Sequence, residues 1–358
     1  MDVRYARYYL EKAKGDLEEA VKLYNEDPND PFESEQKEKE ISALQRFLQL
    51  FQIQNKARTK GKYRTFDDVV SLLKERNKIV IVAGAGISVS CGIPDFRSKD
   101  GFYSKLKKKG LGRPEDIFTL STFLQDPSIY YSNSADLCPT NYIPSPTHFF
   151  FAKLEAEGKL LRVFTQNIDD LEAKAGVSRL VQCHGSMGSA ACMQCHHEVP
   201  IETIEEELRA GEIAYCRVCD KNKREKRGVY KPDVVFFGEN LPKRFFDLSS
   251  LEMPLADMVI VVGTALAVHP VADLPSMVSN VDETPQVLIN REVVGTAGWF
   301  DAHLLGNSDD AIIELVKAMG WEGEVPISLE DRRWATEEIG KLRNEERNRL
   351  SGGDKEEQ

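Results

Sequence analysis

The sequence predicts an α/β fold, in which a parallel sheet is covered by helices on both faces. Short β-branched runs alternate with amphipathic helical stretches from residue 65 to about residue 321. One of these runs leads directly into a glycine-containing loop, Gly84–Ser88. Two close cysteine pairs interrupt the alternation between about residues 186 and 235, which indicates a small inserted module.

The composition is that of a folded protein with an acidic surface. The chain has 358 residues, 41% of them apolar, and a formal net charge of −11. Binding to nucleic acid requires a basic face, so we expect no direct nucleic-acid contact. No run approaches the roughly 20 apolar residues of a membrane span, and residues 1–4 do not resemble a signal peptide. We therefore expect no membrane contact and a cytoplasmic and/or nuclear location.

The elements follow from local periodicity and from turn residues. Residues 1–30 predict a helical pair, and residues 31–64 predict a third helix and a basic linker. Residues 322–358 predict an exposed charged helix, 329–350, and a disordered tail. Between them, the predicted helices are 66–76, 147–157 and 309–319, and the predicted strands are 78–83, 161–165, 258–262 and 286–289.

Two loops carry residues suited to a nucleotide. Gly84 and Gly86 follow a strand and would let backbone N–H groups approach a pyrophosphate, although the third glycine of a dinucleotide fingerprint is absent. Asp95, Phe96 and Arg97 follow closely and could fold over a bound ligand. An ordinary strand-to-loop turn and a proline-containing surface turn are the alternative interpretations.

Polar side chains also follow the strand that ends at Thr165. Gln166, Asn167 and Asp169 could bind a carboxamide and a ribose at this edge of the sheet, or could simply cap the next helix. His184 ends another short apolar run. Its ordinary pKa near 6.5 suits a base that takes a hydroxyl proton at neutral pH, although a lone histidine is more often structural.

The cysteine pairs predict a structural zinc ion. Two Cys-x-x-Cys pairs separated by residues 196–215 form a zinc-ribbon pattern, in which all four thiolates close a tetrahedron and no position stays open for chemistry. We expect the neighbouring His196 and His197 to face solvent. The predicted ligands are Cys192, Cys195, Cys216 and Cys219.

With these motifs in order, residues 70–320 resemble the sirtuin (Sir2-like) family of NAD-dependent protein deacylases. The resemblance implies a Rossmann-like, doubly wound domain and a zinc module, with NAD as a consumed co-substrate and acylated lysine in the cleft between them. His184 would be the general base, assisted by Asn167 and Asp169, which with Gln166 would shape the nicotinamide and ribose pocket. The resemblance assigns further NAD contacts to Gly84, Ala85, Gly86, Ser88, Asp95, Phe96, Arg97, Gly263, Thr264, Asn290 and Glu292.

The resemblance also implies the substrate and the products. A substrate backbone would pair as an added strand between two edges, formed by Phe237, Gly238 and Glu239 and by Leu266 and Val268. The acyl oxygen would displace nicotinamide, and His184 would then activate a ribose hydroxyl for attack on the resulting imidate. Water would complete the reaction to free lysine and O-acyl-ADP-ribose. The expected partners are acylated lysine segments such as histone tails, with the acetyl group preferred because Phe102 and Tyr103 resemble the deacetylase branch.

Three points remain open in the sequence. Ala265 and Asp170 depart from the usual family pattern, and Ala265 removes a hydroxyl contact to the cofactor. Residues 6–21 resemble the last two helices of a ubiquitin-associated domain, which implies a weak ubiquitin contact; a helical arm packing on the core is the alternative. The same site could also transfer ADP-ribose to proteins, or sense NAD without turnover.

Overall fold

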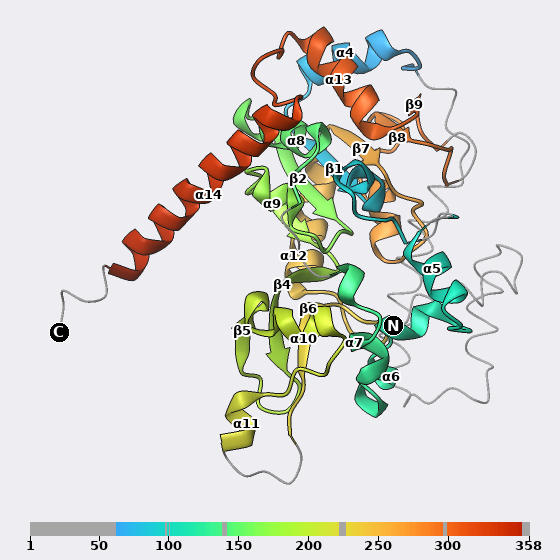
Figure 1. The fold of residues 1–358 in the computed structure, drawn as a ribbon. Coiled ribbons are helices and arrows are strands. Elements are labelled where there is room, and N and C mark those ends of the chain that lie inside the picture. Colours follow the sequence, from blue (N-terminus) through green and yellow to red (C-terminus); the bar gives the residue numbers. More distant parts are fainter. Residues whose placement is uncertain are drawn as a thin grey trace, which may run out of the picture.

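The protein is described by a computed structural model that covers residues 62–352, except 97–98, 100, 138–141, 222–226 and 296–298 (Figure 1). The predicted N-terminal helices and the end of the tail, residues 353–358, lie outside the described residues. In the described part, no helix combines the length and the apolar character that crossing a membrane requires.

The larger domain is built on a six-stranded parallel sheet with the strand order β3-β2-β1-β7-β8-β9. The chain adds β2 and β3 on one side of β1 and then crosses to the other side, so the order reverses between β1 and β7. Open α/β sheets bind ligands at such a reversal. The strands are β1 (Ile79–Ala83), β2 (Leu160–Thr165), β3 (Leu180–Gln182), β7 (Met258–Val262), β8 (Gln286–Asn290) and β9 (Ala302–Leu305).

Helices cover both faces of this sheet, as predicted. Helices α4 (Phe66–Glu75), α8 (Pro146–Ala156) and α13 (Ser308–Met319) pack on one face. Helix α12 (Lys243–Glu252) and a 3₁₀ turn (Val271–Ser276) pack on the other. Since both faces are covered, all residues of β1 and β7 are buried, which explains their continuous apolar sequences.

The smaller domain contains a three-stranded antiparallel sheet, β5-β4-β6, and lies beside the carboxyl edge of the large sheet (Figure 1). Its strands are β4 (Gly185–Cys192), β5 (Glu198–Pro200) and β6 (Tyr230–Val234). Its helices are α5 (Phe102–Lys108), α6 (Leu120–Gln125), α7 (Ser128–Tyr131), α10 (Glu205–Ala210) and α11 (Arg217–Lys221).

This domain draws on two separate parts of the chain, and the sequence predicted only the second of them. Phe118 and Tyr130, from the first part, pack against Phe236, from the second, with ring centroids 5.8 and 5.3 Å apart. One apolar core therefore joins residues 102–137 to the module predicted at 186–235. Such contacts between distant residues have no local periodicity that would reveal them.

Two further helices flank the larger domain. Helix α9 (Leu171–Lys174) follows the Asn167–Asp169 segment, and α14 (Leu329–Gly352) matches the charged helix predicted at 329–350. In Figure 1, α14 extends away from the body of the fold. Ile339 of α14 packs on the apolar core next to Gly176, so its first turns are anchored.

Candidate active site

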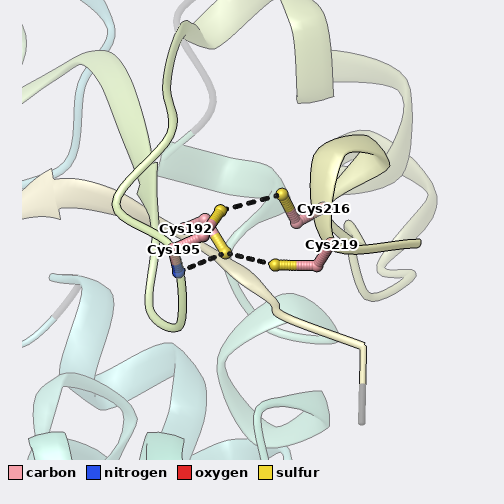
Figure 2. A group of neighbouring side chains, drawn as sticks. All are labelled: Cys192, Cys195, Cys216 and Cys219. Carbon is pink, nitrogen blue, oxygen red and sulfur yellow. Dashed lines mark hydrogen bonds between the residues drawn. The ribbon is translucent and has the colours of Figure 1, made fainter. Parts of the chain in front are cut away.

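The four predicted cysteines converge at one end of the smaller domain (Figure 2). The Sγ atoms of Cys192 and Cys219 are 3.7 Å apart, as are those of Cys195 and Cys216, and all four lie within 4.8 Å of one another. A tetrahedral zinc ion with bonds of about 2.3 Å separates its sulfur ligands by about 3.8 Å. The cluster therefore fits a structural zinc ion with four protein ligands.

The surroundings of this cluster support the same assignment. The backbone N–H groups of Gln194 and Cys195 donate to the Cys192 Sγ atom, which stabilises a thiolate. A Cβ atom at Gly228 would lie 2.5 Å from that sulfur, so only glycine fits there. His196 and His197 are exposed, as expected, and neither belongs to the cluster.

A cleft of about 1340 Å³ separates the two domains. Its floor is formed where β1, β7 and β8 end, through Gly84–Gly86, Gly263–Ala265 and Asn290–Glu292. The Gly86 N–H donates to the Gly263 carbonyl oxygen at 2.8 Å, and a Cβ atom at Gly86 would lie 2.7 Å from the Gly263 Cα atom. The two glycines therefore let the loops meet at the point where the strand order reverses.

A small side pocket of about 40 Å³ shares Asn167 and Phe96 with this cleft. Asp169 lines it, and Ser88 Oγ donates to Asp169 Oδ2 at 2.7 Å. Burial raises the pKa of Asp169. Asp169 Oδ1 also accepts from the Leu171 N–H. Asp169 therefore both lines the pocket and caps the next helix, which was the alternative interpretation from the sequence.

A buried acid and a buried histidine lie close to Asp169, and no motif in the sequence marked either of them. Glu172 accepts a hydrogen bond from Thr165 Oγ1 at 2.5 Å, while its second oxygen has no partner among the described residues. Burial and the nearby Asp169 raise the pKa of Glu172 to about 8. Burial lowers the pKa of His148 to about 3, so the ring is neutral at physiological pH.

His184 lines the cleft just after β3. Its Nδ1 lies 3.0 Å from the Gln166 carbonyl oxygen, and since a carbonyl only accepts, Nδ1 carries the proton. Nε2 then holds a lone pair, and it is shielded from solvent without a partner among the described residues. Burial lowers the pKa of His184. With this geometry, Nε2 of His184 can accept a proton from a hydroxyl group of a ligand bound in the cleft.

Both predicted substrate edges contribute residues to the lining of the cleft. Phe237, Gly238, Glu239 and Val268 line the cleft, whereas the side chain of Leu266 packs on the core of the larger domain. Leu266 has a φ of +46°, which turns its side chain away from the position that an extended strand would give it. The predicted role of Leu266, backbone pairing with a substrate strand, does not depend on where its side chain packs and stays a prediction.

The other predicted cofactor residues are distributed around the same cleft. Asp95, Phe96, Asn290 and Glu292 line it, and Arg97 lies outside the described residues. The Thr264 hydroxyl accepts from the Gln166 amide at 2.8 Å and from the Leu266 N–H at 3.1 Å. The proton of the Thr264 hydroxyl is therefore available for a hydrogen bond to a ligand in the cleft.

The fold and the cleft define a two-domain α/β protein with a nucleotide-type site and a structural zinc module. Residues 84–270 match the Sir2 family, and the chain belongs to that family.

Known proteins of the family are similar over most of the chain. The NAD-dependent protein deacetylase HST1 of Saccharomyces cerevisiae is 40% identical over 285 residues, which cover 73% of this chain and 56% of that protein. The NAD-dependent protein deacetylase sirtuin-1 of Homo sapiens is 40% identical over 269 residues, covering 75% and 35%. The chain thus spans less than two thirds of these relatives. A solved chain described as "Structural Basis for the Mechanism and Regulation of Sir2 Enzymes" superimposes with a TM-score of 0.63 at 31% identity, covering 72% of this chain and 98% of that one.

Proposed function

We propose that this protein is an NAD-dependent protein lysine deacetylase. It transfers the acyl group of a modified lysine to the ADP-ribose part of NAD with the consumption of one water molecule, and the products are free lysine, nicotinamide and O-acyl-ADP-ribose. The observation that carries the proposal is the unpartnered Nε2 of His184 in the cleft, with its tautomer set by Gln166. The relatives named as NAD-dependent deacetylases support it.

The cleft offers complementary surfaces for each part of NAD. The glycine loops at Gly84–Gly86 and Gly263 expose backbone to the pyrophosphate, as glycine-rich loops do in dinucleotide sites. Asn290 and Glu292, at the end of β8, bind the more distant ribose. Asn167 and Asp169 receive the carboxamide of nicotinamide in the side pocket.

His184 acts after nicotinamide has left. Its neutral Nε2 takes a proton from a ribose hydroxyl, so that the hydroxyl oxygen can attack the acyl carbon. The Gln166 carbonyl keeps the ring in the required tautomer and stabilises the positive charge that the ring then carries. The pocket side chains hold the leaving group, and His184 moves the proton.

The substrate is an acetylated lysine within an extended protein segment. Phe237 already pairs through its backbone with Phe118 and Leu120, at 2.6 and 3.1 Å, which fixes this edge on one side. Gly238 is exposed, and its backbone has no hydrogen-bond partner among the described residues, so it can pair with an added strand. Phe96, Tyr103 and Phe118 line the cleft nearby and give the acyl group an apolar path.

Histone tails are the substrates that we propose, together with a nuclear location, since several relatives are named histone deacetylases. The ubiquitin contact of residues 1–30 stays a prediction. A chain that lacks residues 1–30 should lose ubiquitin binding and keep its deacetylase activity.

The test is nicotinamide release from NAD by the purified full chain, with and without an acetyl-lysine peptide. We expect release that requires the peptide and forms O-acetyl-ADP-ribose, and we expect His184→Ala to form almost none. His303→Ala, an exposed histidine on β9, is the matched control and should behave as wild type. Nicotinamide release without peptide would contradict the proposal and would favour ADP-ribosyl transfer or NAD hydrolysis. If no nicotinamide is released at all, NAD sensing without turnover is the remaining function.

A further inference from the structure

Asp170 adopts a backbone conformation that residues with side chains rarely take. Its φ of 63° and ψ of 13° lie in the left-handed region, directly before α9. An aspartate at this position ordinarily turns its carboxylate onto the N–H groups of the helix, but Asp170 makes no such bond. The neighbouring Asp169 accepts from the Leu171 N–H instead. The side chain of Asp170 therefore serves something other than capping.

The Asp170 carboxylate reaches the segment that carries His184. Ser186 Oγ lies 2.8 Å from both carboxylate oxygens, and Gln182 Nε2 donates to Oδ1. Gln182 lies two residues before His184, and Ser186 lies two residues after it. One carboxylate thus holds the chain on both sides of His184.

The chain turns sharply directly after His184. Gly185 has a φ of +74°, and a Cβ atom there would lie 1.9 Å from the Asp233 carbonyl oxygen. Backbone bonds fix the flanks, from the Cys183 N–H to the Thr165 carbonyl oxygen at 2.8 Å and from the Met187 N–H to that of Ile168 at 3.0 Å.

Between these two bonds, the Val235 N–H donates to the His184 carbonyl oxygen at 2.8 Å, and the side chains of Ser186 and Asp170 add further contacts to the turn. The Ser186 hydroxyl accepts from the Gly188 N–H at 2.8 Å while it donates to Asp170. A Cβ atom at Gly188 would lie 2.9 Å from Asp170 Oδ2, which shows how closely this turn packs on the carboxylate.

We propose that Asp170 is a positioning residue for His184: its carboxylate holds Gln182 and Ser186 so that the imidazole meets the ribose hydroxyl. The inference rests on the proposed deacetylase function. Asp170 does not line the cleft, so it acts on the reaction through His184 and not by touching substrate. Its influence should therefore fall on the step that needs the base, and not on the earlier departure of nicotinamide.

The experiment measures both steps in the full chain with NAD and an acetyl-lysine peptide. Exchange of labelled free nicotinamide into NAD reports the first step, and O-acetyl-ADP-ribose formation reports the whole reaction. The variant is Asp170→Gly, because glycine adopts the left-handed conformation readily and so removes the side chain without straining the backbone. We expect product formation to fall about tenfold while exchange stays within about twofold of wild type, since small displacements of a reacting group cost rate steeply.

Two further variants keep the test decisive if Asp170→Gly does not fold. Asp170→Asn keeps one acceptor oxygen and should restore part of the product formation. Ser186→Ala removes one of the two held groups and should change the ratio of the two rates in the same direction as Asp170→Gly.

Equal losses of exchange and product formation, or no loss in folded variants, would overturn the inference alone. A wild-type chain that performs neither reaction would overturn the proposed function and this inference with it.

Discussion

The Gln166 carbonyl oxygen accepts the Nδ1 proton of His184 at 3.0 Å, and this contact leaves Nε2 as the basic nitrogen on the cleft side. It also links the two segments that follow β2 and β3. The segment that carries Gln166, Asn167 and Asp169 and the segment that carries His184 are therefore joined directly by a hydrogen bond.

The pH dependence of activity should report His184. The base must be neutral to accept a proton, and burial lowers the pKa of its imidazole. A plot of kcat/KM against pH should therefore rise with a midpoint below the ordinary value of 6.5 and stay level above neutrality. The profile is measured with saturating NAD and varied acetyl peptide, and a midpoint above 6.5 would contradict this assignment.

Glu172→Gln should change how stability depends on pH. The pKa of Glu172 is raised from 4.5 to about 8, so the folded state keeps a proton that the unfolded chain loses. Its stabilising contribution is complete below pH 4.5 and declines as pH rises to about 8. Glutamine resembles the protonated acid at every pH, so the variant should gain stability relative to wild type as pH rises from 4.5 to about 8.

Thermal melts of both proteins across this range measure the effect, with about 2–4 °C in Tm for each kcal/mol gained. Glu337→Gln, an exposed residue of α14, is the control and should show no such trend. A constant difference between wild type and Glu172→Gln at all pH values would show that Glu172 is ionised at neutral pH.

Removal of zinc should unfold the smaller domain. Cys195→Ser deletes one of the four ligands, and a structural zinc site contributes its binding free energy to folding. We expect the variant to lose bound zinc, measured by metal analysis, together with product formation. Cys91→Ser, a half-buried cysteine outside the cluster, should keep its zinc. Retention of zinc by Cys195→Ser would show that three ligands suffice.

Gly86→Ala should be destabilising. The new methyl group would lie 2.7 Å from the Gly263 Cα atom, so the two loops at the reversal point would have to separate. Forced overpacking of this kind costs about 1–3 kcal/mol, which urea unfolding measures. Gly112→Ala adds the same methyl group where nothing lies within 4 Å and should be nearly neutral. Equal free energies of unfolding for the two variants would mean that the loops at Gly86 and Gly263 can move apart without loss of stability.

Ala265→Ser should strengthen NAD binding. Ala265 is exposed and lines the cleft beside Thr264, where a serine hydroxyl could donate to the cofactor. One added neutral hydrogen bond is worth about 1 kcal/mol, which corresponds to about a fivefold lower Kd for NAD. Calorimetric titration with NAD tests this, and an unchanged Kd would place the hydroxyl out of reach of the cofactor.

Much of the larger domain could be predicted because its signals are local. Strand β7 was expected at residues 258–262 and is found at Met258–Val262, since five consecutive buried residues leave a continuous apolar run. Helix α4 begins where Thr65 and Asp68 form a capping box. Helix α12 was missed, because only Phe245 and Ser249 of its residues are buried and its apolar stripe is therefore weak.

The sequence by itself determined the zinc ligands, the loops at the strand ends and the candidate base, because spacing along the chain and the chemistry of the residue types identify them. Only the tertiary structure decided which groups meet. The Asp170 carboxylate holds Gln182 and Ser186, Leu266 turns away from the cleft, and Glu172 lies buried behind the pocket. These relationships depend on backbone angles and on contacts between distant segments, and neither leaves a period or a spacing in the sequence.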